Sequence, residues 1–271
     1  MYEGLSTDSY AVAVGSDGDF TGCCKLSSSV LFWKERTLHK MLGDYPAEYA
    51  LYDYNVDGLR KGCHGSLVII NETLYYMGLH GIYTYRGGTP VSISANLGNH
   101  EMEQGVAGTD GEVLYLSALD NGKHQFLVFN TALGMWLRED DTRAAAFTRI
   151  GKHCYFLSQS GEVWQADSGA EDSQLEWSAQ FTPFYETVTG RKMFSRLMVR
   201  LQLSKGSWVK AEYRCDGGCW IEAGKIIGSV EDVAQMRIAP NRCDKYEVRL
   251  SGKGVCTILN ILREFSVGGA R

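Results

Sequence analysis

The stretch GVAGTDGEVLYLSALDNGKHQFLVFN, residues 105–130, decides the fold. It contains short runs rich in Val, Leu, Tyr and Phe, and polar turns built from Gly, Asn and Asp separate them. Runs of this kind are typical of β-strands joined by tight turns. The same plan of strand, turn, aromatic strand, turn and strand returns in residues 65–88 and 144–167. The chain is therefore predicted to be all-β and built from a repeat.

The repeat has a regular period. Tyr75, Tyr115 and Tyr155 stand at the same place in three copies, 40 residues apart, and an earlier, more degenerate copy has Phe32 there. A unit of about 40 residues with four short strands has the size of a β-propeller blade. About four units fit before residue 168, at the lower limit of the usual range of about 4 to 8 blades. We expect a small propeller, one with missing blades, or one closed by another chain; the alternative is a meandering β-sandwich with accidental spacing.

A second domain is predicted after the repeat ends. Residues 167–174, DSGAEDSQ, are polar and rich in turn formers, which places a boundary between a propeller-like domain at 1–168 and a second domain at 175–271. About seven short apolar runs follow, and in MFSRLMVRLQL (193–203) leucine and valine alternate with polar residues or methionine. This period of two predicts strands with one buried face. Seven such strands in about 95 residues favour a β-sandwich.

Composition excludes several classes of function. The 271 residues carry a net charge of −5, and their 27 Lys and Arg residues are scattered, so no basic stripe for sequence-specific nucleic-acid binding is present. The sequence contains no run of 18 apolar residues, so no membrane-spanning segment is predicted. The beginning of the chain, MYEGLSTDSYAVAVG, lacks the charged start and apolar core of a signal peptide, so we expect synthesis in the cytoplasm.

The cysteines are predicted to be reduced thiols and to hold no metal. A zinc site needs four ligands, and the pair Cys215 and Cys219 has only the single Cys243 and Cys256 near it, with no histidine beyond His153. In YRCDGGCW (213–220) the residues Asp, Gly and Gly instead predict a tight hairpin turn, with its two cysteines on facing strands. Adjacent cysteines in a strand would point to opposite faces. The eight are Cys23, Cys24, Cys63, Cys154, Cys215, Cys219, Cys243 and Cys256.

No catalytic, cofactor-binding or metal-ligating residue can be assigned from the sequence. There is no Gly-x-Ser-x-Gly motif, and the glycine turns at 87–90 and 251–254 do not continue into a phosphate-binding loop. The histidines are expected at strand edges or turns, as surface residues or with local partners. They are His39, His64, His80, His100, His124 and His153.

Glycoside hydrolysis is the strongest enzymatic alternative, because it needs two carboxylates about 5 to 9.5 Å apart and propellers can place carboxylates around a channel. Turn geometry also explains many of these aspartates. A binding role could instead use exposed aromatic side chains such as Tyr85, Trp136 and Trp164. The candidate carboxylates are Asp53, Asp57, Glu101, Asp110, Asp120 and Asp140.

The end of the chain resembles a known group of proteins. In NRCDKYEVRLSGKGVCTILNILREFSVGGAR (241–271) an Arg-Cys-Asp leads into a strand, a Gly-Lys-Gly turn, a final strand and a glycine-rich tail. Upstream, WSAQFTPF and GRKMFSRLMVRLQLSKGSWVKAEYRCDGGCW show a Trp-led strand, a basic turn and an Asp-Gly-Gly turn before a tryptophan. This pattern is similar to bacteriophage tail structural proteins. The repeats resemble, more loosely, the tail-nozzle and head-completion (stabilisation) proteins of short-tailed phages, whose members are usually longer at the N-terminus.

The resemblance implies a non-enzymatic virion component of the tail or head-tail junction. It implies assembly into a homo-oligomeric ring and contacts with other phage tail or portal proteins, with no cofactor and no membrane. Assembly would take place in the cytoplasm of the host bacterium. The alternative hypothesis is a β-propeller protein that binds or cleaves carbohydrate and recognises host glycans.

Overall fold

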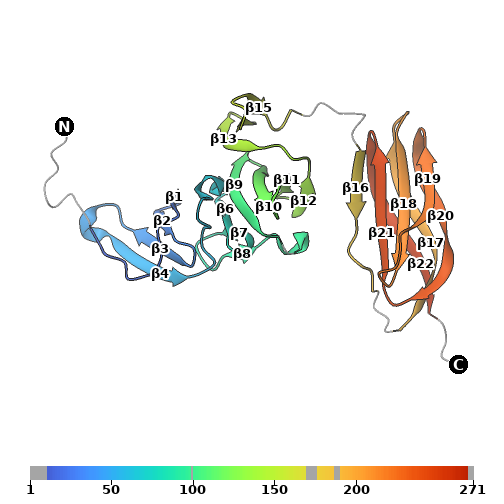
Figure 1. The fold of residues 1–271 in the computed structure, drawn as a ribbon, viewed down its shortest axis with the longest axis horizontal. Helices are drawn as coiled ribbons and strands as arrows, with labels where there is room; N and C mark the ends of the chain where they lie inside the picture. Colours follow the sequence, from blue (N-terminus) through green and yellow to red (C-terminus); the bar gives the residue numbers. More distant parts are fainter. Residues whose placement is uncertain (1–10, 99, 169–175, 186–189, 268–271) are drawn as a thin grey trace. The chain divides into compact units, whose positions relative to one another are not determined.

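The computed structural model describes residues 11–98, 100–168, 176–185 and 190–267, and these residues form two compact units, Met1–Ser168 and Gly169–Arg271 (Figure 1). Most of the predicted boundary stretch, residues 167–174, lies outside the described residues. Strands dominate both units, and the described residues contain no α-helix, only three 3-10 turns. The predicted all-β class is therefore confirmed. The 3-10 turns are η2 (Pro46–Glu48), η3 (His64–Ser66) and η4 (Ala95–Leu97).

The first unit is propeller-like and contains four blades, as predicted. Each blade is an antiparallel meander in which the strands pair in sequence order, and the fourth blade has three strands instead of four. The blades are β1 (Gly22–Leu26), β2 (Ser29–Trp33), β3 (Thr37–Leu42) and β4 (Ala50–Asn55); β5 (Val68–Ile70), β6 (Thr73–Gly78), β7 (Gly81–Tyr85) and β8 (Val91–Ser92); β9 (Met102–Thr109), β10 (Val113–Asp120), β11 (Lys123–Asn130) and β12 (Met135–Arg138); and β13 (Ala144–Ile150), β14 (His153–Ser158) and β15 (Val163–Gln165).

The sequence repeat corresponds to the second strand of each blade. Phe32, Tyr75, Tyr115 and Tyr155 lie on β2, β6, β10 and β14 respectively. The turn that follows β10 holds Asn121 at φ 47° and Gly122 at φ 78°. Two consecutive residues with positive φ form the turn that matches the twist of a two-residue hairpin. Asn121 and Gly122 therefore set the β10–β11 hairpin. Of the repeated aromatics, Tyr75 packs between blades against Phe129, whereas Phe32 and Tyr155 face away from the neighbouring blade.

Neighbouring blades pack face to face through aromatic side chains. Trp33 of the first blade lies 4.6 Å from the ring of Tyr76 in the second. Tyr75 of the second blade meets Phe129 of the third at 6.3 Å. Phe126 of the third blade lies 5.7 Å from Phe156 of the fourth. Tilted aromatic pairs at these centroid distances stabilise the contacts beyond the apolar area buried.

The outer faces of the two terminal blades carry apolar side chains. Contacts join β9 to β5 and to β13, whereas within the described residues no strand of the first blade makes an extensive contact with a strand of the fourth. The outer face of the first blade carries Phe32, Met41 and Leu51. On the fourth blade the side chains of Leu157 and Val163 face away from the third blade, and Val163 is 70% exposed.

The second unit is a β-sandwich, as predicted, and all seven expected runs form strands. One sheet has the order β16-β21-β18-β19 and the other β20-β17-β22. In β17 the predicted alternation is confirmed, because Leu197, Val199, Leu201 and Leu203 are buried in the core between the sheets. The strands are β16 (Glu176–Gln180), β17 (Lys192–Leu203), β18 (Trp208–Cys215), β19 (Ile221–Ile227), β20 (Val230–Cys243), β21 (Tyr246–Lys253) and β22 (Cys256–Val267).

The turn in YRCDGGCW joins β18 to β19 as an antiparallel hairpin, in agreement with the prediction. Asp216 and Gly217 adopt φ values of 50° and 74°, which are the positive values expected of its central residues. The expectation that the two cysteines lie on facing strands is wrong. Cys215 ends β18, but Cys219 lies in the connection before β19 and is exposed. The glycines set the turn, and the connection is longer than a two-residue hairpin loop.

Candidate functional site

A polar cleft lies where loops of the second and third blades meet. In an antiparallel meander, the turn between the second and third strands lies at the same end of the blade as the start of the first strand. The β6–β7 and β10–β11 turns therefore share one face of the unit with the segments that lead into β5 and β9. The cleft measures about 580 Å³ and is lined by Arg60, Leu79, His80, Gly98, His100, Glu101 and Asn121.

Aspartates orient both histidines of the polar cleft. His80 Nδ1 lies 3.1 Å from Asp57 Oδ1, and His100 Nδ1 lies 2.6 Å from Asp120 Oδ2. His100 also contacts the carbonyl of Leu97 through Nε2, so its ring is fixed on both sides. The His80 side chain is 70% exposed. A bound molecule would therefore reach His80 more easily than His100, whose ring is held in one orientation.

Arg60, a cation that lines the polar cleft, is paired with a carboxylate. Arg60 Nη2 donates to Glu103 Oε1 at 2.8 Å. Asp57 accepts from Tyr83 Oη at 3.2 Å, and burial, with the nearby Asp57 charge, raises the pKa of Tyr83 to about 12. The phenol therefore stays protonated and donates. A cleft with both donors and acceptors suits a polyhydroxylated ligand better than a strongly charged one.

Three of the six candidate carboxylates come together here. Glu101 lines the cleft, and Asp57 and Asp120 lie behind the two histidines. The others serve local structure. Asp53 pairs with His39, Asp110 caps the β9–β10 turn, and Asp140 accepts from the backbone N–H of Thr142.

A second groove, of about 500 Å³, lies beside the fourth blade and contains an exposed tryptophan. Trp164 on β15 is 55% exposed, although its strand position faces the same side as Phe156 and the third blade. Hydroxyl, amide and guanidinium groups surround the indole. The groove, which we call the Trp164 groove, is lined by Thr142, Arg143, Phe156, Ser158, Gln159, Ser160 and Trp164.

The other two aromatic residues that were expected to be exposed binding residues pack inside the propeller-like unit. Tyr85 is 1% exposed and packs against Trp33 at 5.8 Å, so the prediction that it is an exposed binding residue is wrong. Trp136 is half-buried, stacks near Phe129, and donates from Nε1 to the carbonyl of Ile93 at 2.8 Å. Alternation along a strand shows that a side chain faces a sheet surface, but not whether another blade covers that surface.

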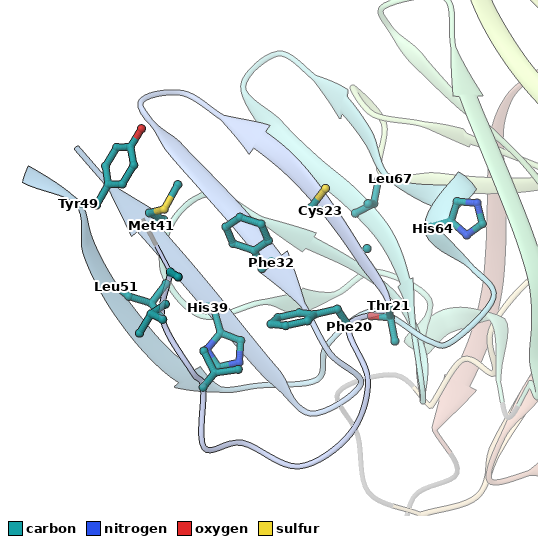
Figure 2. Close-up of a pocket in the computed structure, with 14 residues that line it drawn as sticks. Phe20, Thr21, Cys23, Phe32, His39, Met41, Tyr49, Leu51, His64 and Leu67 are labelled. Atoms are coloured by element: carbon teal, nitrogen blue, oxygen red, sulfur yellow. The ribbon is translucent and has the colours of Figure 1, made fainter. Parts of the chain in front are cut away.

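An apolar cleft of about 920 Å³ lies over the outer face of the first blade (Figure 2). Phe20, Phe32, Met41 and Leu51 line it together with three residues of the N-terminal segment, Ala11, Val12 and Val14. Its polar edge is His39, which is buried in the middle of β3 and held between Asp53 Oδ1 at 2.5 Å and Ser16 Oγ at 2.9 Å. The expectation that the histidines lie at strand edges or turns is therefore wrong for His39.

The cysteines and histidines form no shared metal site within the described residues. No group of three or more His, Cys, Asp or Glu side chains there is close enough to hold one ion. Cys23 and Cys24 lie on opposite faces of β1, as predicted, because they pair with Phe32 and Leu31 respectively. No helix of the described residues is long and apolar enough to cross a membrane.

Comparisons with known proteins give weak structural likenesses. No protein-family model matches the chain, and no curated protein matches it. Among solved structures, exo-β-1,3-galactanase from Phanerochaete chrysosporium with galactose has a TM-score of 0.30 and 9% identity, over 88% of this chain and 79% of that one. A putative TolB from Agrobacterium tumefaciens has a TM-score of 0.36 and 14% identity, over 78% and 87%. A further glycoside hydrolase has a TM-score of 0.31 and 9% identity, over 88% and 83%.

These comparisons correct one expectation. The sequence suggested a protein that is not an enzyme, but the solved structures that match include glycoside hydrolases, so that exclusion is withdrawn. TM-scores near 0.3 assign no reaction to this chain.

Proposed function

We propose that the propeller-like unit binds a carbohydrate and that the Trp164 groove is its platform. The observation that carries the proposal is the exposed indole of Trp164 among side chains that can donate and accept hydrogen bonds. The C–H face of a sugar ring packs against such an indole, because the indole is apolar and its π face is electron-rich. Arg143 and Gln159 can then bond the sugar hydroxyls at the rim of the groove.

A glycan array followed by calorimetry tests this proposal. We expect the full chain to bind a defined glycan, and Trp164→Ala to weaken binding at least about tenfold, which corresponds to about 1.4 kcal/mol. The matched control is Val163→Ala, because Val163 lies on the same strand but faces the opposite side. Equal affinities for the two variants, or a wild-type chain that binds no glycan, would contradict the proposal.

The polar cleft is the place to test for cleavage of a bound glycan. Glu101 is the carboxylate that lines it, and His80 lines the same cleft with an exposed, oriented ring. Release of reducing sugar by the wild-type chain, and its loss in Glu101→Gln, would extend the proposed binding to hydrolysis. The exposed Glu112→Gln is the control, because Glu112 lies in the β9–β10 turn.

A second candidate function is assembly into a virion, at the tail or the head-tail junction of a phage. The specific observation in its favour is the pair of apolar outer faces on the first and fourth blades. In this proposal the partners are copies of the chain arranged in a ring and neighbouring tail or portal proteins. Light scattering on the purified chain tests it: we expect a defined oligomer, and a monomer at micromolar concentration would contradict it.

A further inference from the structure

The thiols of Cys215 and Cys243 meet in the sandwich unit. Cys215 is the last residue of β18, in one sheet, and Cys243 is the last residue of β20, in the other. Both are free cysteines, both belong to the same apolar cluster, and their side chains lie close enough to interact. Two cysteines 28 positions apart in the sequence (243 − 215) therefore lie together where the two sheets approach at one end of the sandwich.

A backbone clamp holds this pair in place. Asp216 Oδ1 accepts from the backbone N–H groups of Asp244 at 2.9 Å and Lys245 at 3.0 Å. The N–H of Asp216 donates to the carbonyl of Lys245 at 3.1 Å. Because Asp216 follows Cys215 and Asp244 follows Cys243, these three bonds fix the backbone next to each thiol.

The two thiols differ in access to solvent. Cys243 is fully buried beside the stacked rings of Phe194 and Tyr246, whose centroids lie 4.4 Å apart. Cys215 is half-buried and packs at the edge of the same core. A small reagent in solution therefore reaches Cys215 first.

We propose that Cys215 and Cys243 form a disulfide bond that links the two sheets of the sandwich in an oxidising medium. The oxidant is a small-molecule disulfide, such as glutathione disulfide. In the first step Cys215 Sγ attacks it, its S–S bond breaks, and one half leaves as a thiol. In the second step Cys243 Sγ loses its proton to solvent and attacks Cys215 Sγ, and the other half leaves as a thiol. Two protein thiols are oxidised and one small disulfide is reduced to two thiols, so the exchange balances.

The second step is expected to depend on pH. Burial, together with the neighbouring Cys215, raises the pKa of Cys243 to about 12. The thiolate is the attacking form. Because little of Cys243 is thiolate at neutral pH, formation of the Cys215–Cys243 bond is slow there, and a rise in pH accelerates it. The inference depends on neither proposed function, because it concerns only the sandwich unit.

Cys219 competes with Cys215 as the disulfide partner of Cys243. It lies four residues after Cys215 and is exposed, and the N–H of Gly218 donates to the carbonyl of Cys215 at 2.9 Å within the same turn. Trypsin cleaves after Arg214 and Lys225, which leaves Cys215 and Cys219 in one peptide. The mass of this peptide joined to the Cys243 peptide therefore cannot tell a Cys215–Cys243 bond from a Cys219–Cys243 bond, and a Cys219→Ser variant is needed.

The experiment incubates the full chain with glutathione disulfide at neutral and at mildly alkaline pH, followed by non-reducing tryptic mass spectrometry. We expect the peptide that starts at Cys215 to be cross-linked to the peptide that starts at Cys243, in the wild type and in Cys219→Ser. Closure should be faster at the higher pH. Cys215→Ser should abolish the link, and Cys256→Ser is the control because Cys256 is a half-buried thiol of the same unit.

A second readout does not depend on variants. The oxidised wild-type chain should lose two titratable thiols, and the sandwich should melt on the order of 10 °C higher until dithiothreitol reverses the change. The inference is overturned if Cys243 remains available to alkylation after unfolding of the oxidised chain. It is equally overturned if the link is lost in Cys219→Ser.

Discussion

Glu212 shows at the scale of one residue how the outer face of the sandwich is held. Its carboxylate accepts from Arg249 Nη2 at 2.9 Å and from Lys210 Nζ at 3.2 Å. Burial alone would raise the pKa of Glu212, but the hydrogen bonds and charges of Arg249 and Lys210 lower it below its usual value. A carboxyl whose pKa is lower in the folded chain stabilises the fold above its unfolded pKa. That contribution is lost as the pH falls through the folded pKa.

Glu212→Gln should therefore weaken the sandwich at neutral pH by about 1 kcal/mol and flatten the acid limb of its stability curve. The measurement is urea unfolding across a series of pH values from neutral to acidic. Glu176→Gln is the control, since Glu176 is an exposed carboxylate at the start of β16. An unchanged pH profile in Glu212→Gln would show that the ion pairs contribute nothing.

At the scale of elements, the third and fourth blades approach each other over a glycine. Gly108 lies on β9, and a Cβ added there would lie 2.6 Å from Cγ of Phe147 on β13. Real Cβ atoms do not approach other atoms so closely, and a rigid ring on a packed strand cannot move away freely. The absence of a side chain at Gly108 therefore sets how closely these two blades pack.

Gly108→Ala is expected to destabilise the propeller-like unit by about 1 to 3 kcal/mol, the usual cost of overpacking. The midpoint of denaturant unfolding, followed by tryptophan fluorescence, measures the effect. Gly88→Ala should change the free energy of unfolding by no more than about 0.5 kcal/mol, because nothing lies within 4 Å of a Cβ at Gly88. Similar midpoints for the two variants would mean that Phe147 adjusts without strain.

At the scale of the whole molecule, the propeller-like unit ends in two unpaired sheet faces. The second and third blades pack against a neighbour on both sides, whereas the described contacts give the first and fourth blades one neighbour each. A contiguous apolar surface on a soluble protein commonly marks an interface. The proposed ring assembly would cover these faces.

A charge on the outer face of the fourth blade should therefore break up the proposed oligomer. In Leu157→Glu, a face that is apolar in the wild type gains an unpaired carboxylate, which is costly to bury in an interface. Light scattering should show a lower mass for this variant at the same concentration. Ile227→Glu is the control, because Ile227 is equally apolar, 71% exposed and part of the sandwich unit. An oligomer that persists in Leu157→Glu would locate the interface elsewhere.

The sequence predicted more of the fold than of the sites. Period-two alternation and turn glycines identified the sandwich strands and the second strand of each blade, because both signals are local. The burial of Tyr85 and His39 depends on another blade or on the N-terminal segment, and neither can be read from a strand's own residues. The same limit hid Cys243 as the neighbour of Cys215, since their proximity depends on the sheets that meet around Asp216.

The N-terminal segment occupies part of the outer face of the first blade, so any partner that binds this face competes with a segment of the same chain. Its Ser16 accepts from Lys34 Nζ through the backbone carbonyl at 2.5 Å and contacts His39 through Oγ. Val12 and Val14 line the apolar cleft that a partner would fill. Any protein that packs on this face must first release these contacts or build on them. For a protein that must release them, association would be limited by the opening rate of the segment rather than by diffusion.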